Sequence, residues 1–348
     1  MPQTRPQTRP QTPPQLRPPT RAELSPHAHP RPHPHPHPHP HPHPHGSAAP
    51  PADPGRRRLL GAAAWGAGAL GGGLLGGCTL GPDQHGPDAP EAAPLARPLR
   101  VAWVLGSGGP RGFVHVGVVK ALVQLGLAPD VIVGASVGAL VGTLHAAGLP
   151  VAELERLALE TQAWQLLRFQ AIGLQKWSGQ GLAPFVNQLL GGRLLQALPT
   201  PMVVAVQRLR DGAVLGLTRG DAGVAVQAAA AIEGQLAPVS IRRELYADAD
   251  LRSPLPVRLA RALGAQRVLA VDVSAYEDRA PPGSERFRDA DLRKRALTQP
   301  DAAAADLLLH PDMGYWAGIS REYRERGIAV GYRATMAQAA GLRALHAA

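Results

Sequence analysis

The chain has 348 residues, with 36 Lys and Arg against 26 Asp and Glu, and a formal net charge of +10. Eight of the basic residues but only two of the acidic ones precede residue 59. The remainder therefore carries 28 basic and 24 acidic residues, an excess too mild to indicate nucleic-acid binding. The single cysteine, Cys78, excludes an intramolecular disulfide and a cysteine-based zinc set.

Residues 1–55 consist mostly of Pro, His, Arg, Gln and Thr, with almost no apolar residues. Such a segment cannot bury a core, so we expect it to be disordered. His and Pro alternate strictly over residues 33–45, a pattern that can chelate zinc or nickel weakly. The alternative is a translation start assigned too far upstream, because export signals normally begin near the N-terminus.

Residues 56–78 have the pattern of an export signal. Three arginines precede a weakly apolar run of Ala, Gly and Leu that ends in Leu75-Gly76-Gly77-Cys78. The arginines resemble a twin-arginine signal, and the last four residues resemble a bacterial lipoprotein box, in which Cys78 is lipidated after cleavage. We therefore expect export to the bacterial cell envelope and a lipid anchor. A glycine-rich membrane span over residues 59–77 and a flexible linker with a chance cysteine are the alternatives.

The Pro-, Gly-, Asp- and Glu-rich residues 79–98 are interpreted as a tether, and the globular domain is expected over residues 99–340. Apolar runs and helix-period segments predict its elements. In chain order these are strand 99–105, helix 113–125, strand 131–133, helices 137–147 and 151–169, strands 202–207 and 214–217, helices 224–232 and 256–263, and strand 268–273. Apolar residues between Leu166 and Leu195 form either a lid or lipid-docking surface, or an ordinary core helix.

Strands that alternate with helices predict an α/β fold with a mainly parallel sheet. Active sites in such sheets lie at the carboxyl ends of the strands. Two glycine-flanked turns fall there, and both follow a predicted strand and open a predicted helix.

The second of these turns is the pentapeptide Gly134-Ala135-Ser136-Val137-Gly138, a G-x-S-x-G pattern. Small residues at Gly134 and Gly138 let the chain bend tightly and let the following helix pack close to the strand. The turn exposes the serine hydroxyl above a helix N-terminus. Its position between a strand and a helix predicts that Ser136 is the nucleophile of an acyl-transfer reaction.

The first turn, Gly106 to Gly112, can bring backbone N–H groups close to an oxyanion. A dinucleotide-binding fingerprint is the rival interpretation. It requires glycine where Ser107 stands and an acidic residue that closes the second strand. Asp130 precedes that strand instead, so we do not expect nucleotide binding.

A nucleophilic serine needs a general base, usually a histidine. Four histidines occur in the globular part: His115, His145, His310 and His346. The first two lie inside predicted helices, where packing explains them, and the other two belong to no motif. An aspartate that acts directly as the base is therefore a possible arrangement.

Three ordered blocks together resemble the patatin-like phospholipase family, from about Arg97 to Ser274. The first comprises residues 105–112 with His115-Val116-Gly117-Val118, the second residues 134–140, and the third Ala230-Ala231-Ile232-Glu233-Gly234, Tyr246-Ala247-Asp248-Ala249-Asp250 and Pro254-Leu255-Pro256-Val257. The resemblance implies a three-layer α/β/α fold and a carboxylic-ester hydrolase of the phospholipase A or lipid acyl hydrolase type. It also implies a lipid or acyl-ester substrate and a membrane surface as partner. No calcium-binding motif is visible in the sequence, so we expect catalysis without a metal ion or cofactor.

Members of this family use a Ser-Asp dyad without a histidine. Carried over, Ser136 is the nucleophile and Asp248 the general base, and the oxyanion hole is formed by Ser107, Gly108 and Gly109. Arg111 occupies the family's basic position after the glycines and either supports that loop, together with Gly112, or caps it at the surface.

The third block departs from the family pattern. Asp248-Ala249-Asp250 stands where the family has Asp-Gly-Gly or Asp-Gly-Ala, Glu233 replaces a proline, and Ser253 replaces an asparagine. Glycine adopts a positive φ freely whereas Ala and Asp do not, and a second carboxylate raises the pKa of the first by like-charge repulsion. These changes leave a second hypothesis open, in which a weak or inactive domain binds lipid or a partner at the envelope as a lipoprotein.

Overall fold

The computed structural model describes residues 81–95, 98–169, 175 and 177–347. The expectations for residues 1–80 lie outside the described residues. These are the disordered extension, the His-Pro tract, the export signal and the lipidation of Cys78. Among the described helices, none has the length and apolar character needed to cross a membrane.

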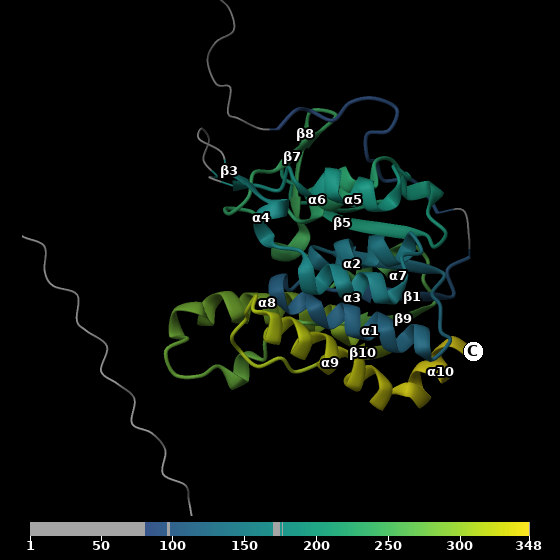
Figure 1. Cartoon of the computed structure of the whole chain (residues 1–348), viewed down its shortest axis with the longest axis vertical. Helices are drawn as coiled ribbons and strands as arrows, with labels where there is room; N and C mark the ends of the chain where they lie inside the picture. The colour runs from purple at the N-terminus through teal and green to yellow at the C-terminus, as the bar shows by residue number, and fades with distance from the viewer. Residues whose placement is uncertain (1–80, 96–97, 170–174, 176, 348) are drawn as a thin grey trace, which may run out of the picture. The chain divides into compact units, whose positions relative to one another are not determined.

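A central sheet organises the described domain (Figure 1). Its strands are β1 (Val101–Leu105), β2 (Val131–Ala135), β5 (Met202–Arg208), β6 (Val214–Leu217), β7 (Val239–Ile241), β8 (Glu244–Asp248), β9 (Arg267–Val271) and β10 (Leu307–Leu309). Their order is β10-β9-β1-β2-β5-β8-β7, and β6 also pairs with β5. The first five of these strands are mutually parallel, whereas β6, β7 and β8 join antiparallel.

The inner parallel strands β9, β1, β2 and β5 are buried on both faces, which explains their nearly continuous apolar sequences. Every residue of β1 and β2 is buried. Alternate side chains of β1 enter different cores: Trp103 and Leu105 belong to one apolar cluster, Ala102 and Val104 to another.

Helices cover both faces of the sheet. They are α1 (Phe113–Gln124), α2 (Val137–Ala146), α3 (Val151–Glu160), α4 (Ala163–Leu166), α5 (Leu182–Leu190), α6 (Ala222–Ala229), α7 (Val257–Ala262), α8 (Arg288–Ala303), α9 (Arg321–Ala337) and α10 (Ala339–Ala347). The core with Trp103 is shared with α1, α2 and α9, and the core with Ala102 is shared with α7 and the end of α8. The expected three-layer α/β/α architecture with a mainly parallel sheet is confirmed.

One predicted helix is too long. The expected helix 151–169 ends at Glu160, and Thr161 is already extended, with φ −66° and ψ 129°. The guanidinium of Arg324 donates to the carbonyls of Ala158, Leu159 and Thr161, which satisfies the end of α3 from another helix. The chain then forms α4 and a short hairpin of β3 (Arg168–Phe169) and β4 (Trp177–Ser178).

The apolar segment Leu166 to Leu195 contains α5, whose Leu182, Val186 and Leu190 are buried in the core. The interpretation as an ordinary core helix is therefore correct for α5. The β3–β4 hairpin before α5 is not part of this core: Phe169 and Trp177 are exposed and their rings meet edge to face.

The described part of the predicted tether, residues 81–95, lies along the domain rather than free of it. The N–H of Gln84 donates to the Ser240 carbonyl at 2.9 Å, and that of Glu91 donates to the Arg219 carbonyl at 3.0 Å. Thr218 exchanges side-chain hydrogen bonds with both backbone groups of Ala93. The composition did not predict this packing, because the backbone groups of a polar segment can pair with strand edges and loops. Ala89 and Leu95 also pack against the two apolar clusters.

Candidate active site

The turn between β2 and α2 holds Ser136 in a strained conformation. Its φ is 53° and its ψ −125°, which a residue with a side chain rarely adopts. A Cβ atom on Gly138 would lie 2.2 Å from the Leu105 carbonyl oxygen, and one on Gly134 would lie 2.6 Å from backbone atoms of Ala139. Both glycines are thus required by the close approach of strand and helix, as the pentapeptide predicted.

The sheet register brings Asp248 to the level of Ser136. Ala135 at the end of β2 pairs with Ala205 of β5, so the next residue, Ser136, lies level with Val206. Val206 pairs with Leu215 of β6 on one edge of β5 and with Asp248 of β8 on the other edge, which β2 occupies as far as Ala205. β2 and β8 therefore follow each other along the same edge of β5, and Ser136 and Asp248 meet level with Val206.

Asp248 is a buried carboxyl group with one free oxygen. Its side chain is 2% exposed. One oxygen, Oδ1, accepts from the N–H of Asp250 at 2.9 Å, whereas the buried Oδ2 has no partner that meets hydrogen-bond geometry. Desolvation raises the pKa of Asp248 to about 7; the nearby Ser136 hydroxyl, as a hydrogen-bond donor, opposes that rise. The two groups are thus close but not tightly bonded, an arrangement common for catalytic pairs without substrate.

The glycine turn after β1 offers two backbone donors. The N–H groups of Gly108 and Gly109 donate to no backbone acceptor within the described residues. Gly109 has a φ of 52°, and a Cβ on Gly108 would lie 2.4 Å from the side chain of Val273. The N–H of Ser107, by contrast, donates to the Pro254 carbonyl at 2.8 Å. The sequence-based assignment of Ser107 as an oxyanion donor is therefore corrected, because this N–H already has an acceptor.

Three residues hold this loop in place. Arg111, in the 3₁₀ turn η1 (Gly109–Gly112), donates to the Tyr315 carbonyl, which favours the loop-supporting role over a surface cap. A Cβ on Gly112 would lie 2.3 Å from Val137, so η1 packs directly on the nucleophile turn. His115 is fully buried with its Nε2 2.8 Å from the Gly106 carbonyl oxygen, and burial lowers the pKa of His115 to about 4, which keeps it neutral.

The other histidines are also engaged away from Ser136. His145 stacks on Trp103 at 5.8 Å between ring centroids, and His346 accepts from the indole N–H of Trp103 at 3.0 Å. His310 stacks on Tyr276 and lies 3.0 Å from the Ser274 carbonyl oxygen. The recorded contacts of these three rings are thus with residues other than Ser136.

The atypical residues after Asp248 are accommodated without backbone strain. Ala249 to Leu251 form a right-handed 3₁₀ turn, η3, capped by the Asp248 side chain, and neither Ala249 nor Asp250 has a positive φ. Ala249 is fully buried against Ala135 and Ala205. The expected conformational cost is therefore absent, because this turn does not use the left-handed region that favours glycine.

Asp250 is neutralised by a residue that sequence reasoning missed. Lys294 of α8 contacts its Oδ1 at 2.7 Å and the Ser107 hydroxyl at 3.3 Å, and that hydroxyl donates to the same carboxylate. The resulting cluster of Ser107, Asp250 and Lys294 joins the glycine loop, the Asp248 turn and α8. Asp250 raises and Lys294 lowers the pKa of Asp248. No local motif marks Lys294, which lies 44 residues from Asp250.

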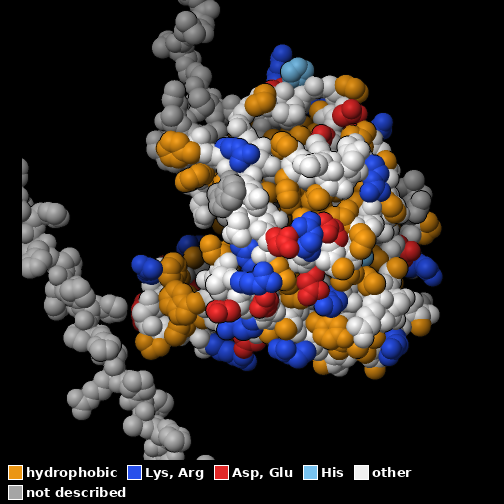
Figure 2. Space-filling view, viewed as in Figure 1, with side chains coloured by type: hydrophobic (Ala, Val, Ile, Leu, Met, Phe, Trp, Pro, Cys, Tyr) orange, Lys and Arg blue, Asp and Glu red, His pale blue; other side chains and the backbone are white. Residues whose placement is uncertain are grey.

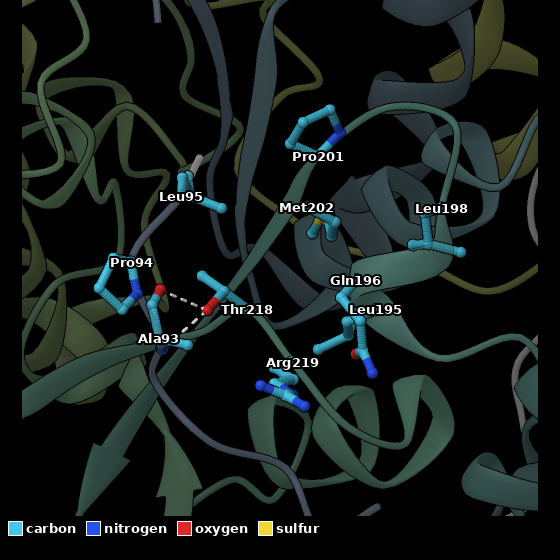
Figure 3. A pocket seen from close by; sticks show the side chains of 10 residues that line it. All are labelled: Ala93, Pro94, Leu95, Leu195, Gln196, Leu198, Pro201, Met202, Thr218 and Arg219. Atoms are coloured by element: carbon cyan, nitrogen blue, oxygen red, sulfur yellow. Dashed lines mark hydrogen bonds between the residues drawn. The ribbon is translucent and has the colours of Figure 1, made fainter. Parts of the chain in front are cut away.

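A separate cavity of about 340 Å³ lies at the opposite end of β5, where that strand begins at Met202 (Figure 3). Residues 93–95 form one wall, and Arg219 lies at its edge. It contains neither Ser136 nor Asp248. Within the described part of the chain, no group of three or more His, Cys, Asp or Glu side chains is arranged to hold a metal ion.

Comparison with known proteins agrees with this geometry. Residues 103–261 match the family model of patatin-like phospholipases. An uncharacterized NTE family protein of Mycobacterium tuberculosis is 30% identical over 219 residues, which cover 60% of each chain. Human patatin-like phospholipase domain-containing protein 6 is 25% identical over 186 residues, or 51% of this chain and 14% of the relative. The chain thus spans about three fifths of the first curated relatives.

Two solved structures are similar at low identity. VipD from Legionella pneumophila matches with a TM-score of 0.48 and 11% identity, over 73% of this chain and 70% of VipD. The type III effector ExoU matches with a TM-score of 0.40 and 14% identity, over 72% of this chain and 54% of ExoU.

The sequence matches and the serine turn agree on the class: residues 103–261 match the patatin-like phospholipase family, and the chain is similar to NTE and patatin-like phospholipase proteins. The resemblance noted in the sequence is thereby confirmed.

Proposed function

We propose that this domain is a serine acyl hydrolase that cleaves carboxylic esters of lipids with Ser136 and Asp248. The observation that carries the proposal is the pairing of a strained serine at a helix N-terminus with a buried carboxyl group of pKa about 7 and a free Oδ2. A base is most effective when its pKa lies near the working pH, and this one faces the only nucleophile in the turn.

The proposed reaction has two steps. The Ser136 oxygen attacks the ester carbonyl carbon while its proton passes to Asp248, and the N–H groups of Gly108 and Gly109 donate to the oxyanion. The C–O bond breaks, the leaving alcohol takes the proton from Asp248, and an acyl-serine remains. Water then gives a proton to Asp248 as its oxygen attacks the acyl carbon. The bond from that carbon to the Ser136 oxygen breaks, and Asp248 returns the proton to this oxygen, which releases the fatty acid and restores Ser136.

The test is covalent labelling of the full chain with a fluorophosphonate, followed by peptide mass spectrometry, beside hydrolysis of p-nitrophenyl octanoate in EDTA. We expect the label on Ser136 and turnover in the presence of the chelator, because the proposed chemistry uses no metal ion. A folded protein that is neither labelled nor active would instead favour the lipid- or partner-binding alternative. The unstrained backbone of Ala249 and Asp250 supports the enzyme.

The pH dependence of activity is expected to report the charges around Asp248. Asp248 must be ionised to accept a proton, so activity rises as pH passes through about 7. Lys294→Met removes a cation that lowers this pKa and should move the acid limb to higher pH, by up to about one unit. Asp250→Asn removes an anion that raises it and should move the limb to lower pH. If the acid limb of activity lay at the same pH in both variants and in the parent, the assignment of Asp248 as the base would be contradicted.

A membrane surface is proposed as the site of action. Phe169 and Trp177 on the β3–β4 hairpin and Trp316 and Ile319 before α9 are exposed, with 63% of Phe169 and Ile319 accessible. Figure 2 shows hydrophobic side chains near the β3–β4 hairpin and near α8 on one side of the molecule. Exposed aromatic side chains of this kind suit the interface between water and lipid.

Sedimentation with phosphatidylcholine–phosphatidylglycerol vesicles measures this docking. We expect a double variant, Trp177→Ser with Trp316→Ser, to reduce the vesicle-bound fraction several-fold. The matched control Leu308→Ser, an exposed residue on the edge strand β10, should bind like the parent. Unchanged binding of the double variant would rule these two side chains out as anchors.

Export and lipid anchoring through Cys78 are proposed from the leader sequence. Metabolic labelling with palmitate in a bacterial host that processes lipoproteins should label the parent and not Cys78→Ser, and the label should fractionate with membranes. Equal labelling of the two proteins, or cytosolic recovery of an unprocessed chain, would contradict this localisation.

A further inference from the structure

An apolar cavity of about 210 Å³ begins beside the nucleophile turn. Val137, the residue after Ser136, lines it, as do Pro110 and Gly112 of η1, which follows the oxyanion donors. The cavity therefore starts between the nucleophile and the glycine loop. A carbonyl group held by these two elements would place its substituent at this entrance.

The cavity runs along α2. Val137, Leu140, Val141 and Leu144 line it, at positions i, i+3, i+4 and i+7 of one helix face. Val137 and Leu144 are seven residues apart, which corresponds to a rise of about 10 Å along the helix axis, or two helical turns. The cavity thus extends from the nucleophile turn along α2 as a partly open apolar channel.

The facing wall is α3, which the short loop 147–150 joins to α2. Leu154, Leu157 and Ala158 line the cavity at i, i+3 and i+4 of α3, and Thr161, which follows the last residue of α3, lines it as well. Because a short loop makes the two helices antiparallel, Leu154 lies at the deep end with Leu144, and Thr161 lies at the end near Val137. The small side chain of Ala158 lies in between.

The charged residue on this wall does not make the channel polar. Arg324 lines the cavity, but its Nη1 donates to the carbonyls of Ala158, Leu159 and Thr161, and its Nε donates to the Ile319 carbonyl. These bonds attach α9 to the end of α3 and fix the wall. Leu166, Phe185 and the exposed Ile319 complete the lining toward the surface.

We propose that this cavity binds the acyl chain of the scissile ester and selects a straight chain of medium length. The proposal rests on the hydrolase function proposed above. At roughly 30 Å³ for a group the size of a water molecule, the cavity holds about seven such groups. An octanoyl chain has one carbonyl carbon at Ser136 and seven further carbons to bury, so it matches this volume, whereas a palmitoyl chain exceeds it.

The test compares p-nitrophenyl acetate, octanoate and palmitate with the full chain. We expect the highest kcat/KM for octanoate. Ala158→Phe fills the middle of the channel and should lower the octanoate-to-acetate ratio of kcat/KM at least tenfold. Ala152→Phe places the same bulk on an exposed position of α3 that does not line the cavity, and should leave the ratio unchanged. An unchanged ratio in a folded Ala158→Phe protein would overturn the proposal.

A binding measurement separates this inference from the hydrolase function. Sodium octanoate is titrated calorimetrically into Ser136→Ala and into the same variant with Ala158→Phe. Octanoate binding that Ala158→Phe abolishes supports the acyl site even when the parent hydrolyses no ester. Hydrolysis by the parent with equal octanoate binding in both variants would leave the proposed function intact and reject the acyl site.

Discussion

Replacing Ser136 with alanine is expected to lower kcat for p-nitrophenyl octanoate by about 10⁴-fold or more, as removal of the nucleophile does in other serine hydrolases. Alanine lacks the oxygen that forms the acyl intermediate, and water alone must then attack the ester. A small residual rate is expected, because the N–H groups of Gly108 and Gly109 still stabilise the oxyanion. The measurement is a steady-state rate at pH 8, with fluorophosphonate labelling as a second readout.

The control for Ser136→Ala is Ser136→Gly. Glycine adopts the φ of 53° at position 136 without strain, so this variant should be as inactive as the alanine variant but more stable than it, by about 1 kcal/mol. Thermal unfolding distinguishes the two variants. Full activity in either one would show that another residue is the nucleophile, and a glycine variant less stable than the alanine variant would contradict the strained turn.

The nucleophile half of the site is predictable from sequence because it is local. Strand β2, Ser136 and helix α2 are consecutive, and the glycines at 134 and 138 carry the steric requirement within five residues. Most of the predicted strands and helices appear in the structure for the same reason: their apolar periodicity is continuous. The boundary at Glu160 was missed because a distant side chain, Arg324, satisfies the end of α3.

The base half depends on contacts between distant segments. Sequence alone indicates Asp248 only through the family resemblance, since its alignment with Ser136 comes from the register of β5 with two neighbours. The pairing of Asp250 with Lys294 involves α8, a polar helix with no apolar stripe to predict it. The use of the Ser107 N–H by Pro254 is likewise invisible in the glycine motif.

Because its partner lies on a distant segment, Asp250 is interpreted from the sequence alone as unfavourable for Asp248. Beside Asp248, an unpaired carboxylate would raise the pKa of the base through repulsion. In the structure, Lys294 and the hydroxyl of Ser107 share its charge. Asp250, which departs from the family pattern, is thus paired with Lys294 on α8, and both residues change the pKa of Asp248.

Replacing Asp248 with asparagine is expected to lower kcat by about 10²- to 10⁴-fold, the range for loss of a general base. Asparagine keeps Oδ1 as an acceptor for the N–H of Asp250 but cannot take a proton from Ser136. The remaining activity should lack the acid limb near pH 7 that the parent shows. A parent-like pH profile in Asp248→Asn would show that another group is the base.

Asp248→Asn, which is expected to lower activity, is expected to raise stability at pH 8. The pKa of Asp248 is raised from 3.8 to about 7 in the folded state, so the folded protein holds a proton that the unfolded chain releases, and stability contributed by this group falls as pH rises from about 4 to 7. Asparagine carries no such charge. We therefore expect Asp248→Asn to match the parent near pH 4 and to exceed it at pH 8, by on the order of 1–3 kcal/mol. Denaturant unfolding at the two pH values measures this difference. A variant that is less stable than the parent at pH 8 would mean that the ionised carboxylate is stabilised by its surroundings, and that Asp248 is a structural anion rather than a base held ready for Ser136.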